Sequence, residues 1–509
     1  MVLRGGWVIG LGLTLAAGPA FGQAQPNGGV QSPPKAKPAS MAPATTTRAA
    51  PNGTGSKKSL APPGTPHTLA EALATTYSTQ PALLAERARL RATDENVPQA
   101  LSGWRPTVVM AGTTGYGDGF SRQFSSSGGG GFLNSRTDRL IGTAQATLTQ
   151  PLYNGGKTPA SINRAKNQVM AERATLIQQE QTSFTNVVTA YVGVIQAQQV
   201  LALNVNNEQV LAKQLQATND RFRVGEITRT DVAQAEAALA GATAQRQTSE
   251  GQLQTARGTY QQVVGFLPPG DLVEPQPLAL PAKNEQEAIA LAANNNPLVV
   301  AALFNDAAAK DAVDVAFAQL LPQLSFQGQM FQSDNSGARS SQLNGYQALL
   351  QLSVPVYQGG QEYSAVRQAK QSEQQTAKLI DDARRTAVQN AIQSWETLVA
   401  AKASADSTRA QIQANSIALE GVEREAIVGS RTTLDVLNAQ QALLQSQVTL
   451  VQNLAQVVTA SYQVAVAIGR LTARDLNLPV PLYDETAYYN AVKNKWVGLG
   501  DYATGQPGR

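Results

Sequence analysis

Residues 148–156 read Leu-Thr-Gln-Pro-Leu-Tyr-Asn-Gly-Gly, and residues 352–360 read Leu-Ser-Val-Pro-Val-Tyr-Gln-Gly-Gly. The two stretches share a Pro-x-Tyr-x-Gly-Gly pattern, and their prolines are 204 positions apart (355 − 151). The same step relates Val224-Gly225 to Val428-Gly429. A period this long indicates that the chain is one structural unit written twice.

The beginnings of the two copies match at a longer step. Gln80-Pro81 corresponds to Asn296-Pro297, 216 positions on (297 − 81), and Pro106 corresponds to Pro322 at the same step. The first copy therefore carries 12 extra residues (216 − 204) before its Pro-x-Tyr-x-Gly-Gly stretch. Its Gly- and Ser-rich residues 117–131 lie in that window, and we expect them to form a surface loop with a mobile tip.

Each copy predicts a helix, two strands, a long helix and a shorter helix. The long helices, at 161–223 and 362–427, contain no proline and each predict a length of roughly 95–100 Å. The shorter helices are expected at about 68–98, 230–265, 284–316 and 432–468. Apolar residues in the long and final helices alternate steps of three and four, which is typical of coiled-coil packing. In the helix from 230, Ala and Gln dominate these positions, which predicts closer or wetter packing.

The strand predictions rest on alternation of apolar with neutral polar residues. In residues 323–330 the apolar side alternates with Gln and Ser, and residues 143–149 alternate in the same way. This pattern suits a lumen on one face and lipid or protein on the other, although a soluble hairpin with one wet face shows it too. Four strands leave two open edges, and about eight are needed for the smallest barrel, so two or three chains are required. The predicted strand–helix junctions are Pro106, Pro151, Pro322 and Pro355.

Composition excludes several classes of protein. The 509 residues include one His and no Cys, which removes disulfides, thiolate chemistry, N-terminal lipidation and His-based catalytic or metal sites. The net charge of +4 argues against nucleic-acid binding. No stretch after the N-terminus has about 18 consecutive apolar residues, so no transmembrane helix is expected. We predict no catalytic residue, cofactor or metal, and no enzymatic activity.

The N-terminus has the features of a secretory signal. Arg4 precedes an apolar run at 7–17 that is too short to span a bilayer, and Ala20-Phe21-Gly22 fits a cleavage site. The alternative is an uncleaved anchor. The predicted organisation is a signal peptide at 1–24, a disordered Pro/Ala/Ser-rich linker at 25–66, a first repeat at 67–265, a connector at 266–283, a second repeat at 284–469, and a segment with a loose tail at 470–509.

Together, these motifs in this order resemble the TolC-type outer-membrane efflux proteins of Gram-negative bacteria, over about residues 68–475. The resemblance implies a membrane α+β fold: a homotrimer in which four strands per chain form one twelve-stranded β-barrel, continued by an α-helical periplasmic tunnel. It implies that the connector at 266–283 and the segment at 470–509 are equatorial. It implies an exit duct of a tripartite efflux or type I secretion system. The partners implied are outer-membrane lipid, a periplasmic adaptor and an inner-membrane pump of the RND, MFS or ABC type. Drugs, metal ions and exported proteins remain possible cargoes.

The resemblance also implies a periplasmic gate. Carried over by position, Asp435 is the ring carboxylate, and Arg431 is the basic link to Asp231. Asn438 stands where the family's archetype has a second ring acid, so the gate is expected to be less acidic. Three converging Asp435 side chains would attract cations; the alternative is an ordinary acid at a helix N-terminus.

The helix–helix turns are the predicted adaptor-docking sites. They are represented by Val224, Gly225, Val428 and Gly429, whose glycines allow the tight turns. The alternative function is a structural or adhesive coiled-coil stalk at the cell surface. A stalk explains the helices but not the paired, duplicated strands.

Overall fold

The computed structural model describes residues 66–125, 130–336, 340–500 and 502. The predicted signal peptide, most of the predicted linker and most of the last ten residues lie outside the described residues. The first half of the chain comprises α1 (Leu69–Thr79), α2 (Pro81–Asp94), α3 (Asn96–Leu101), η1 (Ser102–Trp104), β1 (Thr107–Ser125), β2 (Gly131–Asn154), α4 (Lys157–Arg223) and α5 (Arg229–Val264). The second half comprises α6 (Glu285–Asn295), α7 (Pro297–Phe317), η2 (Ala318–Leu320), β3 (Gln323–Asp334), β4 (Gln342–Ser353), α8 (Gln361–Ile427), α9 (Thr433–Ile468) and α10 (Ala487–Val492).

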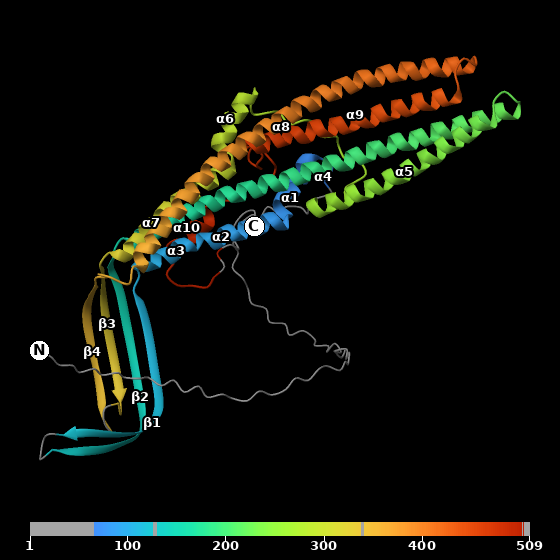
Figure 1. Cartoon of the computed structure of the whole chain (residues 1–509). Helices are drawn as coiled ribbons and strands as arrows, with labels where there is room; N and C mark the ends of the chain where they lie inside the picture. The colour runs from blue at the N-terminus through green and yellow to red at the C-terminus, as the bar shows by residue number, and fades with distance from the viewer. Residues whose placement is uncertain (1–65, 126–129, 337–339, 501, 503–509) are drawn as a thin grey trace, which may run out of the picture. The chain divides into compact units, whose positions relative to one another are not determined.

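The two halves repeat each other in element order and in helix length. Helices α4 and α8 each have 67 residues, and α5 and α9 each have 36. At 1.5 Å per residue the long helices extend for about 100 Å, as the sequence predicts. Each long helix packs along the helix that follows it, α4 against α5 and α8 against α9 (Figure 1).

The helix that opens each half is broken, which corrects the expectation of single helices at 68–98 and 284–316. Pro81 and Pro297 each begin a new helix. Proline has no N–H to donate to the preceding turn, and it forces the residue before it out of the helical region. Gln80 and Asn296 are accordingly extended, with ψ of 118° and 128°.

The helical core is largest around the middle of α4. Phe184, Val187 and Tyr191, which follow the predicted coiled-coil spacing, are fully buried there. The Tyr191 hydroxyl shares its single proton between the backbone oxygens of His67 and Val273, both at 2.8 Å. These bonds fix the chain before α1 and after α5 to the same point of α4.

Two segments, Lys157–Arg223 and Glu285–Leu320, are long and apolar enough to cross a membrane by length and composition alone. The sequence criterion of consecutive apolar residues did not find them. Helices α4 and α7, which lie in these segments, pack against each other. At 67 residues, α4 is also more than three times the length of roughly 20 residues that a span requires.

The four strands form one antiparallel sheet in the order β1-β2-β3-β4. Strands β3 and β4 pair over their full 12 residues each. Strands β1 and β2 are longer, with 19 and 24 residues. The loop predicted at 117–131 is therefore wrong for most of its length, since 117–125 belong to β1. The sequence Tyr116-Gly-Asp-Gly-Phe120 alternates with period two, and its glycines occupy only one face.

Candidate functional site

The turns between α4 and α5 and between α8 and α9 share one backbone geometry. In the first, Gly225 N donates to Phe222 O (2.9 Å) and Glu226 N donates to Arg221 O (3.0 Å). In the second, Gly429 N and Ser430 N make the equivalent bonds, at 3.3 and 3.0 Å. This pair of bonds is the Schellman motif, which satisfies the last carbonyls of a helix and requires a left-handed residue. Gly225 and Gly429 supply it, with φ of 79° and 83°.

The helix that follows each turn begins with a capping box. The Thr432 N–H and hydroxyl donate to the Asp435 carboxylate at 3.0 and 2.9 Å, and Asp435 N donates back to Thr432 Oγ1 at 3.3 Å. Thr228 and Asp231 form the matching box on α5. The backbone N–H of Thr432 is the main cause of a lowered pKa for Asp435, and the Thr228 hydroxyl has the same effect on the pKa of Asp231. Both carboxylates are therefore charged at neutral pH.

Each turn also contains one ion pair, with reversed polarity between the two. In the first turn, Arg221 on α4 contacts Glu226 at 2.6 Å. In the second, Glu425 on α8 contacts Arg431 at 2.9 Å. The hydrogen bond from Arg221 lowers the pKa of Glu226, and the bond to Glu425 raises the pKa of Arg431. The contacts described for Arg431 and Asp231 are local ones, so the link predicted between them stays a prediction.

Apolar side chains protrude from both turns. Val224 is 77% exposed and Val428 is 78% exposed, and Ile427 beside it is also exposed. Asn438 lies one helical turn beyond Asp435 and is exposed. Because Glu226 and Arg431 are paired within their turns, the exposed apolar side chains, the two valines and Ile427, are available to contact a partner.

The sheet separates apolar from neutral polar side chains. One row across the four strands is Met110, Ala146, Met330 and Tyr346, and Met110 and Tyr346 are more than 80% exposed. The row on the other face is Val109, Thr147, Gln329 and Gln347.

On that polar face, cross-strand bonds join the side chains. Gln347 donates to Gln329 at 2.5 Å, Gln329 donates to Gln145 at 3.2 Å, and Gln327 donates to Gln351 at 2.5 Å. Over the length of β3 and β4, the positions that the register assigns to this face carry no charged side chain. This face is uncharged, as the sequence predicts, but it is not polar throughout, because Val109, Phe331 and Leu349 also lie on it.

The four prolines lie near the strand ends, with one difference from the prediction. Pro106 and Pro322 immediately precede β1 and β3, and Pro355 follows β4. Pro151 lies inside β2, where the pairing with β3 shifts register before Tyr153. A bulge tolerates a residue that cannot donate to the ladder.

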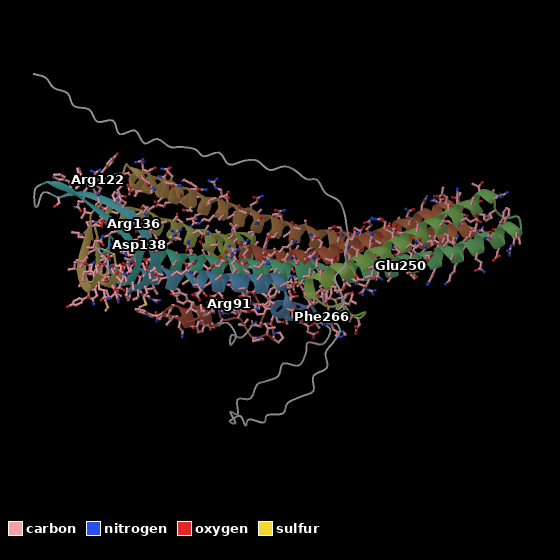
Figure 2. All side chains as sticks on the ribbon, turned by 90° about the horizontal axis from the view of Figure 1, so that it is seen from below. Arg91, Arg122, Arg136, Asp138, Glu250 and Phe266 are labelled. Carbon is pink, nitrogen blue, oxygen red and sulfur yellow. The ribbon has the colours of Figure 1, made fainter. Side chains whose placement is uncertain are left out.

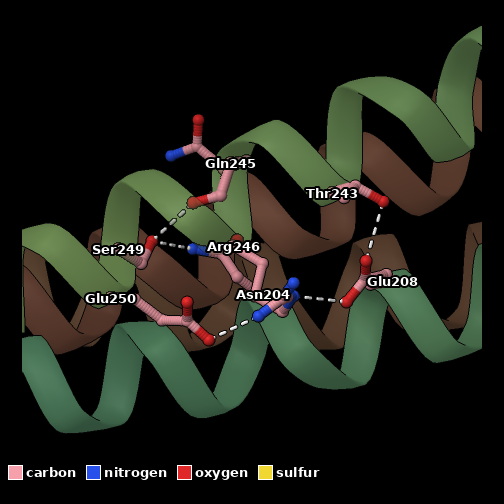
Figure 3. Close-up of polar contacts among 7 residues, drawn as sticks. All are labelled: Asn204, Glu208, Thr243, Gln245, Arg246, Ser249 and Glu250. Carbon is pink, nitrogen blue, oxygen red and sulfur yellow. Dashed lines mark hydrogen bonds and ion pairs between the residues drawn. The ribbon is translucent and has the colours of Figure 1, made fainter.

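The interface between α4 and α5 contains a polar network (Figure 3) beside buried apolar contacts such as that of Leu211 with Ala242. Arg246 contacts Glu208 at 2.7 Å, and the Thr243 hydroxyl donates to the same carboxylate at 2.7 Å. Asn204 donates to the Ser249 hydroxyl at 2.6 Å. Glu208 and Arg246 follow no repeating pattern in the sequence, so the sequence did not predict their contact.

A buried charged group beneath the C-terminal segment was missed as well. The Arg87 guanidinium is 1% exposed and lies 4.4 Å from the Tyr77 ring centroid and 5.1 Å from that of Tyr483. Burial raises the pKa of both Asp94 and Glu180 to about 7. Among the described residues there is no cluster of three His, Asp or Glu side chains that could hold a metal ion.

A chain with two long helical hairpins, a sheet with one apolar exposed face and two matched helix turns has the architecture of a bacterial outer-membrane duct. The family model described as outer membrane efflux protein matches residues 73–265 and 288–470. The chain belongs to this family.

Relatives and solved structures agree. The chain is 36% identical over 436 residues to the outer membrane efflux protein BepC of Brucella suis biovar 1, covering 85% of this chain and 92% of that protein. It is 26% identical over 355 residues to TolC of Escherichia coli K12, covering 66% and 70%. The structure of VceC from Vibrio cholerae superposes with a TM-score of 0.67 at 19% identity, covering 79% of this chain and 96% of that one. The predicted efflux-duct family and function are confirmed, and they replace the stalk alternative.

Proposed function

We propose that three copies of this chain close one twelve-stranded barrel in the outer membrane of a Gram-negative bacterium. The observation that carries the proposal is the sheet. Within the described residues, β1 and β4 each have a strand neighbour on one side only. Unpaired edge amides cost several kcal/mol each in lipid, so the edges must meet other copies.

The polar face favours three copies over two. The interior of an eight-stranded barrel is just wide enough for its own side chains to fill it. The inward rows here include Gln145, Gln329 and Gln347, which are long amides. Twelve strands leave a water-filled passage between such side chains. The apolar face, with Met110 and Tyr346, then faces lipid.

The helices continue the barrel as a periplasmic tunnel about 100 Å long. Because each long helix has a strand at its start and a hairpin turn at its end, the turns lie at the periplasmic mouth. Three Asp435 carboxylates near the three-fold axis, with Asn438 one turn inside, form a ring that attracts cations. Arg431 and Asp231 link neighbouring hairpins when the ring is closed.

The docking surface for a periplasmic adaptor comprises Val224, Gly225, Val428 and Gly429. The exposed valines provide apolar contact, and the glycines keep the turns narrow. The adaptor joins the duct to an inner-membrane pump. Replacing both glycines with Val is expected to abolish efflux-dependent drug resistance while trimers stay in the outer membrane. Full resistance in that double variant contradicts the docking role.

Barrel closure can be tested by cross-linking, because the chain has no Cys. Ala111→Cys on β1 is combined in turn with a single Cys at 343, 345, 347, 349 or 351 on β4. One register is expected to yield covalent dimers and trimers in the outer membrane and nothing larger. Longer ladders, or no cross-linked species in any register, would overturn closure by three copies.

The gate is tested with two variants at one position. Asp435→Ala removes both the charge and the capping acceptor, whereas Asp435→Asn removes the charge and keeps an acceptor for Thr432. If the ring carboxylate controls the mouth, both variants raise single-channel conductance in planar bilayers and weaken block by divalent cations. An effect of Asp435→Ala alone assigns Asp435 to helix capping and refutes the gate role.

A further inference from the structure

The hairpin of β1 and β2 extends beyond the rest of the sheet. Strand β2 pairs with β3 only from Gly142 onward, whereas the pairing with β1 continues from Gly115–Ile141 to Ser125–Gly131. These 11 residue pairs form a two-stranded ribbon that turns away from the line of the four-stranded sheet (Figure 1). At about 3.3 Å per residue the ribbon is roughly 35 Å long.

The ribbon lies outside the part of the sheet that a membrane needs. The 12 residues of β3 extend for about 40 Å, which at a tilt of about 40° gives a height near 30 Å. That height already covers the apolar band of about 25 Å typical of outer-membrane barrels. The ribbon is at the end of the strands opposite to the helices, so it is on the external side.

One face of the ribbon is nevertheless aromatic. Tyr116, Phe120 and Phe124 occupy it on β1, and Phe132 lies opposite Phe124 on β2. All four are more than half exposed, and the Phe124 and Phe132 rings pack edge to face at 5.4 Å. By the alternation of β1 this face is continuous with Val108 and Met110, on the apolar face of the sheet. Within the ribbon, the opposite face of β1 has only Gly115, Gly117, Gly119, Ser121, Gln123 and Ser125.

By the register of the two strands, charged groups alternate with these rings on the same face. Figure 2 shows Arg122, Arg136 and Asp138 along the ribbon. The Arg122 guanidinium stacks 4.2 Å from the centroid of the Phe132 ring. Arg136 contacts Asp118 at 3.2 Å. Tyr116 donates to Asp138 at 2.5 Å, which relieves the direct opposition of Asp118 and Asp138. The ribbon therefore presents rings held among arginines rather than a purely apolar surface.

We infer that the aromatic face of this ribbon lies on the outer leaflet and that Arg122 binds lipid phosphate there. Tyr is enriched at the membrane–water interface because one end of its side chain is apolar and the other wet, and arginines extend their charged ends to the headgroups there. The three Phe rings supply apolar contact beside them. Guanidinium groups bind phosphate through paired hydrogen bonds. This face lies on the same side of β1 as Val108 and Met110 of the lipid-facing surface, whereas a surface meant for water has no need of four exposed rings. This inference rests on the proposed barrel.

The test uses full-length protein in phosphatidylcholine vesicles, with one fluorophore on an introduced Cys and nitroxide quenchers at the headgroup or deep in the acyl chain. Phe120→Cys is the ribbon probe, and Ser121→Cys, on the opposite face, is its matched control. Met110→Cys reports the barrel itself. We expect loss of fluorescence at 120 with headgroup nitroxide, no loss at 121, and loss at 110 with acyl-chain nitroxide.

The outcomes separate the two proposals. Quenching at 110 without quenching at 120 overturns the ribbon inference and leaves the barrel standing. No quenching at 110 refutes the barrel. In vesicles of an uncharged glycosyl lipid without phosphate, quenching at 120 should fall, and Arg122→Gln should lower it in phosphatidylcholine. Equal quenching in both lipids refutes phosphate recognition by Arg122.

Discussion

Gly429→Ala isolates the energy of one turn. Gly429 has φ of 83°, and a Cβ built on it meets no atom within 4 Å. The substitution therefore causes no clash, and its whole cost is the left-handed conformation, about 1–2 kcal/mol for an L-residue. By the factor of ten per 1.4 kcal/mol, the turn should open about 5–30 times more often.

The Ser430 amide reports this opening, because it donates to Glu425 O at 3.0 Å only when the turn is closed. Hydrogen exchange at Ser430 should accelerate by about 5–30-fold in Gly429→Ala. Gly421→Ala is the matched control, since Gly421 is also exposed and free of Cβ neighbours but lies within α8. There the substitution stabilises the helix by up to about 1 kcal/mol, so exchange at Ser430 should not accelerate. Unchanged exchange in Gly429→Ala refutes the reasoning.

Three other substitutions test the helical body by melting temperature. Tyr191→Phe removes the donor to two carbonyl oxygens and should destabilise the fold by about 1–3 kcal/mol; an unchanged melting temperature contradicts this. The pKa of Asp94 is raised in the folded state, so protonation of Asp94 stabilises that state. This contribution is fully present below about pH 4 and is lost as pH rises to about 7. Asp94→Asn should therefore reduce the difference in stability between about pH 5 and pH 8, and an unaltered difference counts against it. Arg246→Leu should lower the free energy of unfolding by less than about 1 kcal/mol, because the ion pair of Arg246 is partly exposed. Adding Glu208→Gln to the same chain should restore the melting temperature. A double variant that melts below the single variant contradicts this.

The long helices could be predicted because their limits are local. Each begins after a Gly-Gly pair and ends at a Val-Gly pair. The one proline between these limits, Pro159, lies in the first turn of α4, where a helix tolerates proline. The β1–β2 ribbon could not be predicted, since Gly117 and Gly119 suggest a loop unless the two glycines are recognised as one face of a strand. Their backbone is held by pairing with Arg139 and Thr137 of β2, 18 or more positions away.

The buried charges were missed for a related reason. Arg87 is buried on α2, whereas Arg89, two positions further along the same helix, is exposed. Tyr483 reaches Arg87 from a place almost 400 residues further along the chain. Spacing within one helix says nothing about such a partner. The hairpin turns, by contrast, depend on a few adjacent residues, and sequence reasoning placed them correctly.

The two hairpins have the same backbone geometry but different residues at matching positions. Asn204 donates to Ser249 in the first hairpin, and at the step of 204 the same two places hold Thr408 and Asn453, where Asn453 donates at 3.0 Å. Both hairpins thus have this hydrogen bond, but the Asn donor is on the first helix in one hairpin and on the second helix in the other. A search for identical residues at the step of 204 therefore does not find it.

The charged pair beside this bond has no such counterpart. At the same step, Arg246 and Glu208 correspond to Leu450 and Ile412 in the second hairpin, which are both apolar. Since salt screens partly exposed ion pairs and does not weaken apolar contacts in this way, high ionic strength should loosen the hairpin of α4 and α5 more than that of α8 and α9. In a tunnel built from this chain, the hairpin of α4 and α5 thus has a salt-sensitive pair at positions where the hairpin of α8 and α9 has apolar residues, although their backbones match.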